Sequence, residues 1–333
     1  MKTLARIAAG TIGPLALAGA ALPVSAQSVA PLPAAAHVQA QGARDPVAED
    51  AETPDLIHLG QDANSRMTVP VHIGDVGPFS FMVDTGAQRT VLTHQTADRL
   101  GLVPNGQVRL VSVAGVKEVS LVSVAELTMG TRRFVGLVAP VVDGHELGAE
   151  GIVGLDGLQD QRVDIDFARR RMLIGQSPPD ATSDSDFTGD FGLVVKARRR
   201  SGQLIMTEAL IDGVRVDVMI DTGADNSIGN LALQKALNLR RTSESADLVA
   251  VTGQTITAAI GRAKSMQIGG MRINNLMFAY ADAPAFAYLK LNHRPALMLG
   301  MRDLSAFRRI AIDFARRRVM FNFGAKPETL AAR

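Results

Sequence analysis

The chain carries one long pattern twice, and this repeat limits what it can fold into. FMVDTGAQRTVL begins at Phe81 and VMIDTGADNSIG begins at Val218, each followed by a short helical pattern that ends in Leu. Downstream, VSVAGVKEVSL, MGTRRF, GIVGLDGL and VDIDFARRRMLI match VAVTGQTITAA, IGGMRI, ALMLGMRDL and IAIDFARRRVMF in the same order. Matches that keep their order over a whole segment indicate duplication of a complete lobe. Two homologous lobes are therefore predicted.

Each copy consists mostly of strand patterns. In the first, MTVPVHI and PFSFMV flank a Gly-Asp-Val-Gly turn and lead into Asp84. In the second, LIMTEALI and VRVDVMI flank Asp212-Gly213, a strong hairpin turn, and lead into Asp221. With one short helix in each copy, these patterns predict a mainly β fold of two lobes.

The N-terminus has the pattern of an export signal. Lys2 and Arg6 precede an apolar stretch, and small residues at 24–26 offer a cleavage point before Gln27. A membrane anchor is the alternative, but glycines and a proline interrupt the stretch, which is short for a spanning helix. Residues 1–26 are therefore predicted to be a signal peptide. The protein is predicted to be exported, to the periplasm or to the exterior, without stable membrane insertion.

Composition divides the rest of the chain. Residues 27–55, rich in Ala, Pro and Gln, are predicted to be a flexible linker, acting either as a tether or as an activation segment. Residues 56–176 form the first predicted lobe and 177–189 an interlobe linker of Pro, Ser and Asp. The second predicted lobe spans 190–325, and 326–333 form a tail.

Charge and residue types exclude several functional classes. Removing the signal takes away two of the 35 basic residues and none of the 33 acidic ones, so the mature chain is neutral and nucleic acid is not a predicted partner. The absence of Cys excludes disulfides and a thiol nucleophile. The six His lack metal-ligand spacing, so neither a metal nor another cofactor is predicted. The basic stretches DFARRR, from Asp166 and Asp313, and KARRR, at 196–200, are predicted to be exposed hairpin turns.

Asp84 and Asp221 are the candidate catalytic residues. Each follows an apolar strand pattern and precedes Thr and Gly, so the carboxylate lies at the edge of a core where the backbone turns tightly. A single Asp-Thr-Gly is more often a plain turn. Two copies at equivalent places in two lobes would instead bring the carboxylates together, and two like charges that close share one proton. Such a pair holds an acid and a base in one site.

These motifs resemble those of retroviral-type and pepsin-type aspartic peptidases. Each copy has Asp-Thr-Gly-Ala, a hairpin with a small tip, and two apolar residues before Gly, at 152–154 and 298–300. The resemblance covers most of residues 56–325 and is greatest to exported bacterial relatives of the retroviral enzymes. It implies two retropepsin-like β-barrel lobes with the active-site cleft between them. It also implies an aspartic endopeptidase that acts on peptides or proteins without a metal.

The resemblance further implies a role for each motif residue. The ionised carboxylate of the pair would take a proton from a water held between Asp84 and Asp221, while the protonated one donates to the scissile carbonyl oxygen. The threonines would bond across the lobe interface, and the glycines would receive the substrate backbone. These supporting residues are Thr85, Gly86, Thr222 and Gly223.

Two flaps are predicted, because both copies keep a hairpin with a small tip, at 112–116 and 251–254. Neither tip contains Tyr, unlike the pepsin pattern. Ala87 and Ala224 follow Asp-Thr-Gly where pepsins usually carry Ser or Thr. Because Ala cannot donate a side-chain hydrogen bond to the ionised pair, a pH optimum less acidic than a pepsin's is predicted. The predicted flap-tip residues are Ala114, Gly115, Thr252 and Gly253.

Two alternatives stay open from the sequence. The lobes are predicted to pair within a monomer, because the linker gives each lobe a high effective concentration of the other, but like lobes of two chains are an alternative pairing. The duplicated fold is also compatible with a protein that binds peptides without cutting them. Against that reading, a binding protein has no need of a like-charged pair.

Overall fold

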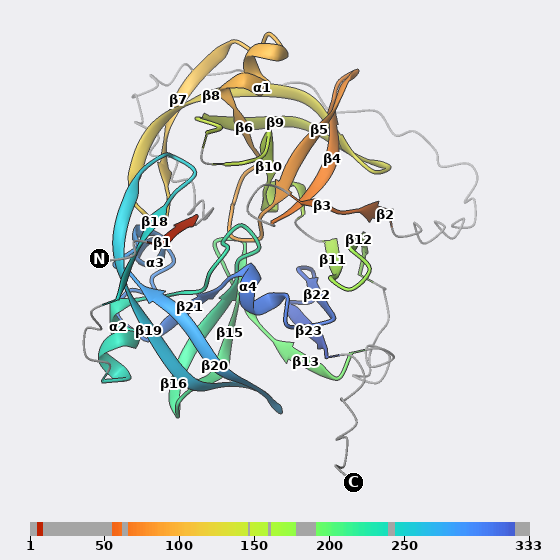
Figure 1. Cartoon of the computed structure of the whole chain (residues 1–333). Coiled ribbons are helices and arrows are strands. Elements are labelled where there is room, and N and C mark those ends of the chain that lie inside the picture. The colour runs from red at the N-terminus through yellow and green to blue at the C-terminus, as the bar shows by residue number, and fades with distance from the viewer. Residues whose placement is uncertain are drawn as a thin grey trace, which may run out of the picture.

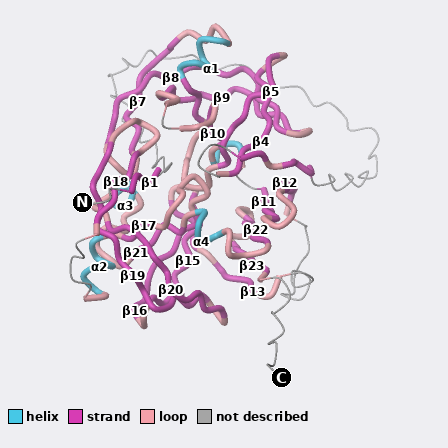
Figure 2. Tube along the Cα trace, viewed as in Figure 1, coloured by secondary structure: helices cyan, strands magenta, loops and turns pink. Residues whose placement is uncertain are grey.

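The computed structural model describes residues 5–8, 55–61, 66–145, 147–158, 161–177, 191–238 and 244–323. Most of the predicted signal peptide and of both predicted linkers, and the whole predicted tail, lie outside these residues. The described part is mainly strand with a few short helices, as predicted (Figure 2). Its strands form three sheets, one in each lobe and one shared between them (Figure 1).

The first lobe is built on an eight-stranded sheet. In order across the sheet, its strands are β3 (Gly60–Gln61), β4 (Met67–Ile73), β5 (Val76–Val83), β10 (Gly151–Val153), β6 (Val91–Thr93), β9 (Arg132–Val142), β8 (Val116–Met129) and β7 (Pro104–Val111). Strand β4 also pairs with β8, which curls the sheet around its core. In β4, buried Val69, Val71 and Ile73 alternate with exposed Pro70 and His72, the period of a strand with one face in the core.

The second lobe repeats this arrangement in a nine-stranded sheet. In order, its strands are β1 (Ala5–Ala8), β18 (Ser245–Val249), β19 (Thr255–Ile268), β20 (Met271–Tyr280), β17 (Ile228–Gly229), β21 (Ala296–Leu299), β16 (Val214–Ile220), β15 (Gln203–Ile211) and β14 (Arg198–Arg200). Strand β19 also pairs with β15, as β8 does with β4. The burial patterns of β8 and β19 agree at all but one position, so the duplication extends to which residues face the core.

Strand β1 lies within the predicted signal peptide. It pairs parallel with β18 as the outermost strand of the second lobe's sheet. Cleavage before Gln27 stays a prediction, and it would leave β18 as the edge strand on that side.

A six-stranded sheet joins the lobes. In order, its strands are β13 (Leu193–Lys196), β23 (Arg318–Asn322), β22 (Arg309–Asp313), β11 (Gln161–Asp166), β12 (Arg171–Gln176) and β2 (Asp55–His58). At its centre, β11 of the first lobe pairs antiparallel with β22 of the second, with Asp164 opposite Ala311. These two residues occupy equivalent places in the two copies, so a local two-fold axis passes between them.

The helices are short and mostly equivalent between lobes. Helix α1 (His94–Arg99) begins after Thr93, whose side chain accepts from the Thr96 N–H, and α2 (Leu231–Ala236) begins after Asn230, which accepts from Leu233. A 3₁₀ turn, η1 (Leu155–Gly157), corresponds to α4 (Met301–Leu304). Helix α3 (Pro284–Tyr288) has no counterpart among the described residues of the first lobe.

Most turns lie where the sequence predicts them. Asp212 and Gly213, with φ of 45° and 84°, form the predicted two-residue hairpin turn. The first-lobe turn is shorter than predicted, because Val76 and Gly77 belong to β5 and leave only Gly74-Asp75 as the turn. Both DFARRR segments turn as predicted, at 167–170 and 314–317.

The prediction of a turn at KARRR was wrong. Residues 193–196 and 198–200 are strands β13 and β14, each at the edge of a sheet, and the turn falls at Ser201-Gly202. Lys and Arg are common on edge strands, where charge discourages pairing with another chain. No helix among the described residues is both long and apolar enough to span a bilayer.

Candidate active site

Asp84 and Asp221 follow the last residues of β5 and β16, and both are fully buried. The Asp84 N–H donates to Val153 O at 3.1 Å, and the Asp221 N–H donates to Leu299 O at 3.0 Å. These carbonyls belong to the predicted apolar-apolar-Gly elements, which run parallel to the strands that carry the acids. Equivalent parts of the two lobes therefore hold the two carboxyl groups in equivalent positions.

Each carboxylate also accepts two backbone hydrogen bonds from its own loop. Oδ1 of Asp84 accepts from the N–H groups of Gly86, at 2.7 Å, and Ala87, at 3.0 Å. Oδ1 of Asp221 accepts from Gly223, at 3.1 Å, and Ala224, at 3.2 Å. Ala87 and Ala224 thus contact the acid pair only through their backbone N–H groups. Among the described residues, none donates a hydrogen bond to Oδ2 of Asp84.

The two threonines cross between the lobes, as the resemblance implies. The Thr85 hydroxyl donates to Ile220 O at 2.9 Å, and the Thr222 hydroxyl donates to Val83 O at 2.7 Å. Each hydroxyl also accepts the N–H of the other threonine, at 3.0 Å for Thr85 N and 3.2 Å for Thr222 N. This buried network has near two-fold symmetry, and it locks the two acid-bearing loops to each other.

The two glycines lie where one loop meets the acid of the other. A Cβ added to Gly86 would lie 2.8 Å from Asp221 Oδ1, and one added to Gly223 would overlap the Asp84 carboxyl group. A side chain at either position is excluded on steric grounds, so Gly is required for close approach. The two carboxyl groups therefore share one small buried space.

Comparison with known proteins agrees with this geometry. The sequence model of the aspartyl protease family matches residues 69–156 and again residues 207–302. The chain belongs to the aspartyl protease family. Each match contains one Asp-Thr-Gly and ends near the apolar-apolar-Gly element of the same lobe, so the protease carries the family unit in tandem. A comparison with curated protein sequences found no match.

The electrostatics of the protease site follow from burial. Desolvation raises the pKa of Asp84 well above its ordinary value, and the nearby Asp221 raises it further. The N–H groups of Gly86 and Ala87 and the charge of Arg66 act in the opposite direction. One carboxyl group of the pair is therefore protonated in a pH range where an ordinary Asp is ionised.

Both predicted flap hairpins are present. Residues 112–115 connect β7 to β8, and residues 250–254 connect β18 to β19. The Ser112 N–H donates to Gly115 O and the Ala250 N–H to Gln254 O, both at 2.8 Å. Gly253 occupies the second turn with φ of 77°.

The two flap tips meet each other. The Lys117 ammonium donates to Thr252 O at 3.1 Å, and the Gln254 side-chain amide donates to Val116 O at 3.4 Å. A Cβ on Gly115 would lie 2.6 Å from Gln254 Nε2, so the two tips are in close contact at this point.

Each tip also packs into the other lobe, which the sequence analysis missed. Val113 of the first flap is fully buried in a second-lobe cluster with Met219 and Phe286, and Ala114 packs against it. Val251 of the second flap is buried in a first-lobe cluster around Met82. Small apolar residues in both tips were visible in the sequence, but their partners lie in the opposite lobe and follow no local spacing.

A buried acid supports each loop from beneath, and neither acid was predicted from the sequence. The Asp156 carboxylate accepts from the N–H and hydroxyl of Thr90, both at 2.8 Å, and Asp303 accepts from the Ser227 hydroxyl. Burial raises the pKa of both acids. Each acid follows the Gly of its apolar-apolar-Gly element, Asp156 by two residues and Asp303 by three, so an acid in both GIVGLDGL and ALMLGMRDL was a signal, although the two acids do not align.

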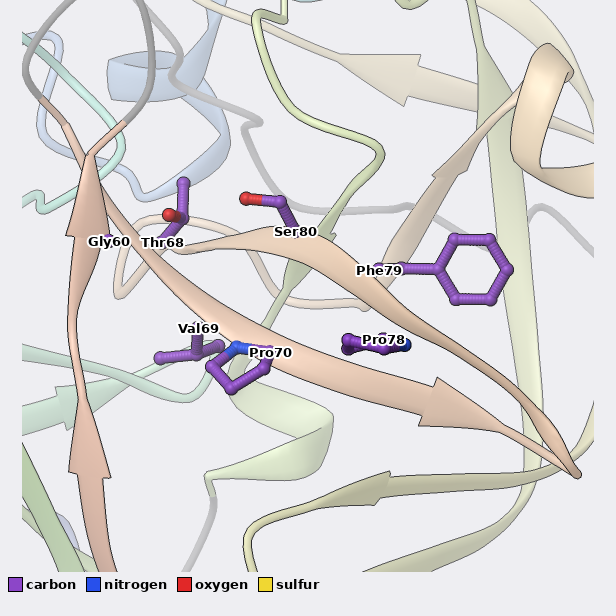
Figure 3. Close-up of a pocket in the computed structure, with 7 residues that line it drawn as sticks. All are labelled: Gly60, Thr68, Val69, Pro70, Pro78, Phe79 and Ser80. Atoms are coloured by element: carbon purple, nitrogen blue, oxygen red, sulfur yellow. The ribbon is translucent and has the colours of Figure 1, made fainter.

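Two hollows on the described surface are not lined by the acid pair. One, of about 230 Å³, lies along β3, β4 and β5 of the protease's first lobe and is lined by residues without ionisable side chains (Figure 3). Another, of about 190 Å³, lies at the seam with α4 and is lined by Met67, Phe167, Arg170 and Met301 among others. Neither is lined by Asp84 or Asp221. Among the described residues, no three or more His, Cys, Asp or Glu gather in a way that suits a metal ion.

Proposed function

We propose that the chain is an aspartic endopeptidase that hydrolyses peptide bonds with water activated between Asp84 and Asp221. The main support is the buried carboxylate pair, drawn from both lobes and fixed by the crossed threonines. The pair carries one proton, so it can act as base and as acid in the same turnover. Membership of the aspartyl protease family supports the same reaction class.

The proposed reaction needs no covalent enzyme intermediate. The ionised carboxylate takes a proton from water as the water oxygen attacks the scissile carbonyl carbon, and the protonated carboxyl donates its proton to the carbonyl oxygen. The tetrahedral intermediate collapses as its C–N bond breaks: the carboxyl group that took the water's proton passes it to the amine nitrogen, and the other carboxylate takes a proton from one hydroxyl of the intermediate, which restores the pair. Asp84 Oδ2, which accepts no hydrogen bond from described residues, is suited to contact this water. Gly86 and Gly223 let each acid-bearing loop lie close to the carboxyl group of the other, and their backbone is proposed to receive the substrate backbone.

The flaps are proposed to act as lids over the pair. Their tips touch through Lys117, Thr252 and Gln254 and are anchored by Val113 and Val251, so they must part to admit a peptide. Closure afterwards would exclude bulk water and strengthen the electrostatic interactions within the site.

The active unit is proposed to be one chain with both lobes paired. The register of β11 and β22 supports this, because Asp164 lies opposite Ala311 and accepts from Arg309, with Nη2 2.6 Å from Oδ2. In a pair of two first lobes, the same register would set Asp164 against a second Asp164. Like charges directly opposite each other destabilise a strand pair. Export to the periplasm or exterior is likewise proposed, on the N-terminal pattern alone.

Peptide digestion tests the proposal. The purified protein is expected to cut members of a broad peptide library at internal bonds, read out by mass, between mildly acidic and neutral pH. EDTA serves as a control for contaminating metalloproteases. Trimming from the ends only would contradict the endopeptidase assignment. Peptide binding without cleavage would instead favour a binding protein with a protease fold.

The pH–rate profile is expected to have its maximum at less acidic pH than that of a pepsin. Burial and Asp221 raise the pKa of Asp84, and Ala87 and Ala224 offer no hydroxyl to stabilise the ionised pair. Since activity needs one ionised and one protonated carboxyl, raised pKa values move the active range upward. A rate that is still rising at strongly acidic pH would contradict this expectation.

A further inference from the structure

The two lobes place residues of different charge beside the acid pair, and β-strand register identifies the equivalent positions. In the first lobe Thr68 pairs with Met82, and in the second Ile205 pairs with Met219. Met82 and Met219 each stand two residues before the acid. Arg66 and Gln203, two residues before Thr68 and Ile205, therefore occupy equivalent positions.

Arg66 makes a charged connection to the opposite lobe. Its side chain is 1% exposed, and its Nε lies 3.6 Å from Oδ1 of Asp225, the fourth residue after Asp221. Its Nη2 donates to Leu147 O. A guanidinium this deeply buried is costly unless it is paired and hydrogen-bonded, and these two partners offset that cost.

Gln203 makes the equivalent connection without charge. Its buried side-chain amide donates to Gly86 O in the opposite loop. Gln88, the equivalent of Asp225, donates to Ser201 O and accepts from the Tyr288 hydroxyl at 3.5 Å. The pair of acids therefore has a cation–anion pair on one side and neutral amides on the other.

Arg66 is the cation that acts on the acid pair. The charged side chains that influence the pKa of Asp84 are Asp221, which raises it, and Arg66, which lowers it. Asp225 pairs with Arg66 and holds it in place. A buried charge is screened less than one at the surface, so Arg66 can act on the pair although its effect on the pKa of Asp84 is smaller than those of burial, Asp221 and the two backbone N–H groups.

We propose that Arg66, held by Asp225, is a positioning residue that favours the singly ionised form of the acid pair and so sets the acid limb of the pH–rate profile. This inference rests on the proposed peptidase function. It assigns the two lobes unequal parts: the first supplies a buried cation at the position where the second has Gln203.

The test replaces the ion pair on one side of the acids by the neutral amides found on the other side. The double variant Arg66→Gln/Asp225→Gln reproduces the Gln203 and Gln88 pair, so it removes both charges without leaving one unpaired. The acid limb is expected to move to higher pH. At a fixed pH on that limb, the rate of the variant, divided by its own plateau rate, is expected to be about threefold or more below the same ratio for the wild type. The reason is that a smaller fraction of the pair is singly ionised. The plateau rate is expected to change less than the acid limb.

Two further variants separate charge from packing. Arg66→Lys keeps the cation but loses the guanidinium geometry, so its acid limb is expected to match the wild type even if the protein is less stable. Glu126→Gln/Arg133→Gln removes an exposed ion pair, with Arg133 Nε 3.0 Å from Glu126 Oε1, far along β8 and β9 from the pair of acids. It is the matched control and should leave the limb unmoved.

The outcomes are distinct. The proposal is overturned if the double variant is folded and active but its acid limb has not moved. It is also overturned if the acid limb of Arg66→Lys moves as far as that of the double variant. If the double variant does not fold, the Arg66→Lys profile alone decides, since retained charge predicts a retained limb. Absence of cleavage by the wild type contradicts the peptidase function itself, which is a separate result.

Discussion

Asp84→Asn and Asp221→Asn should each abolish peptide cleavage while the protein stays folded. Asn can neither accept the proton of water nor donate one to a carbonyl, so the base and the acid are lost together. The rate is expected to fall by about 10²–10⁴-fold or more for either change. Because the two acids act as a unit, the double variant should be little worse than either single one. Initial rates on one good peptide substrate measure this.

Stability provides the control for these variants. The pKa of Asp84 is raised in the fold, so its carboxyl binds a proton more tightly there than in the unfolded chain, where an Asp titrates near about 4. Its contribution to stability is therefore complete at low pH and is lost as the pH rises toward the folded pKa. Asn does not ionise, so it avoids this loss of stability at neutral pH. Both variants are therefore expected to unfold at or above the wild-type unfolding temperature at neutral pH. A variant that cuts as fast as the wild type contradicts the shared-pair mechanism.

Gly223→Ala is expected to have the second-largest effect. Its new Cβ would overlap the Asp84 carboxyl group, so either the loop or the acid must move. Overpacking of this kind costs about 1–3 kcal/mol, and a displaced carboxyl group should remove most of the activity. Thermal unfolding and the cleavage rate are measured together.

Gly270→Ala is the matched control for that change. Gly270 lies in a turn of the same lobe, has no heavy atom within 4 Å of an added Cβ, and does not have a positive φ. It should be close to the wild type in both measurements. If Gly223→Ala were equally mild, the two acid-bearing loops would be farther apart than this structure has them.

Features that recur within the chain were predictable from the sequence. The repeat locates the two acids, both threonines, both glycines and both flap hairpins, because each depends on residues close in sequence and is present twice. Asp-Gly at 212–213 likewise fixes a turn through its own backbone preferences.

Contacts between the lobes were not predictable in this way. The Arg66–Asp225 pair and the burial of Val113 in the second lobe both join residues more than a hundred positions apart. Such contacts depend on how one lobe docks on the other, and no local period encodes that. KARRR was misjudged for a different reason: its three arginines form β14, an edge strand in a hairpin with the next strand β15, and the turn of that hairpin lies just beyond them at Ser201-Gly202.

Helix α3 has a consequence for how a peptide can lie in the site. The described first lobe has no equivalent helix, and only on this side does a Tyr288 hydroxyl reach Gln88 beside an acid-bearing loop. An assembly of two identical lobes offers a peptide the same surroundings whichever way its chain runs. Here the amino-terminal and carboxy-terminal halves of a bound peptide meet different groups. If a peptide lies along these groups as proposed, the two directions of binding would differ in free energy, and one polarity of the peptide chain would be preferred.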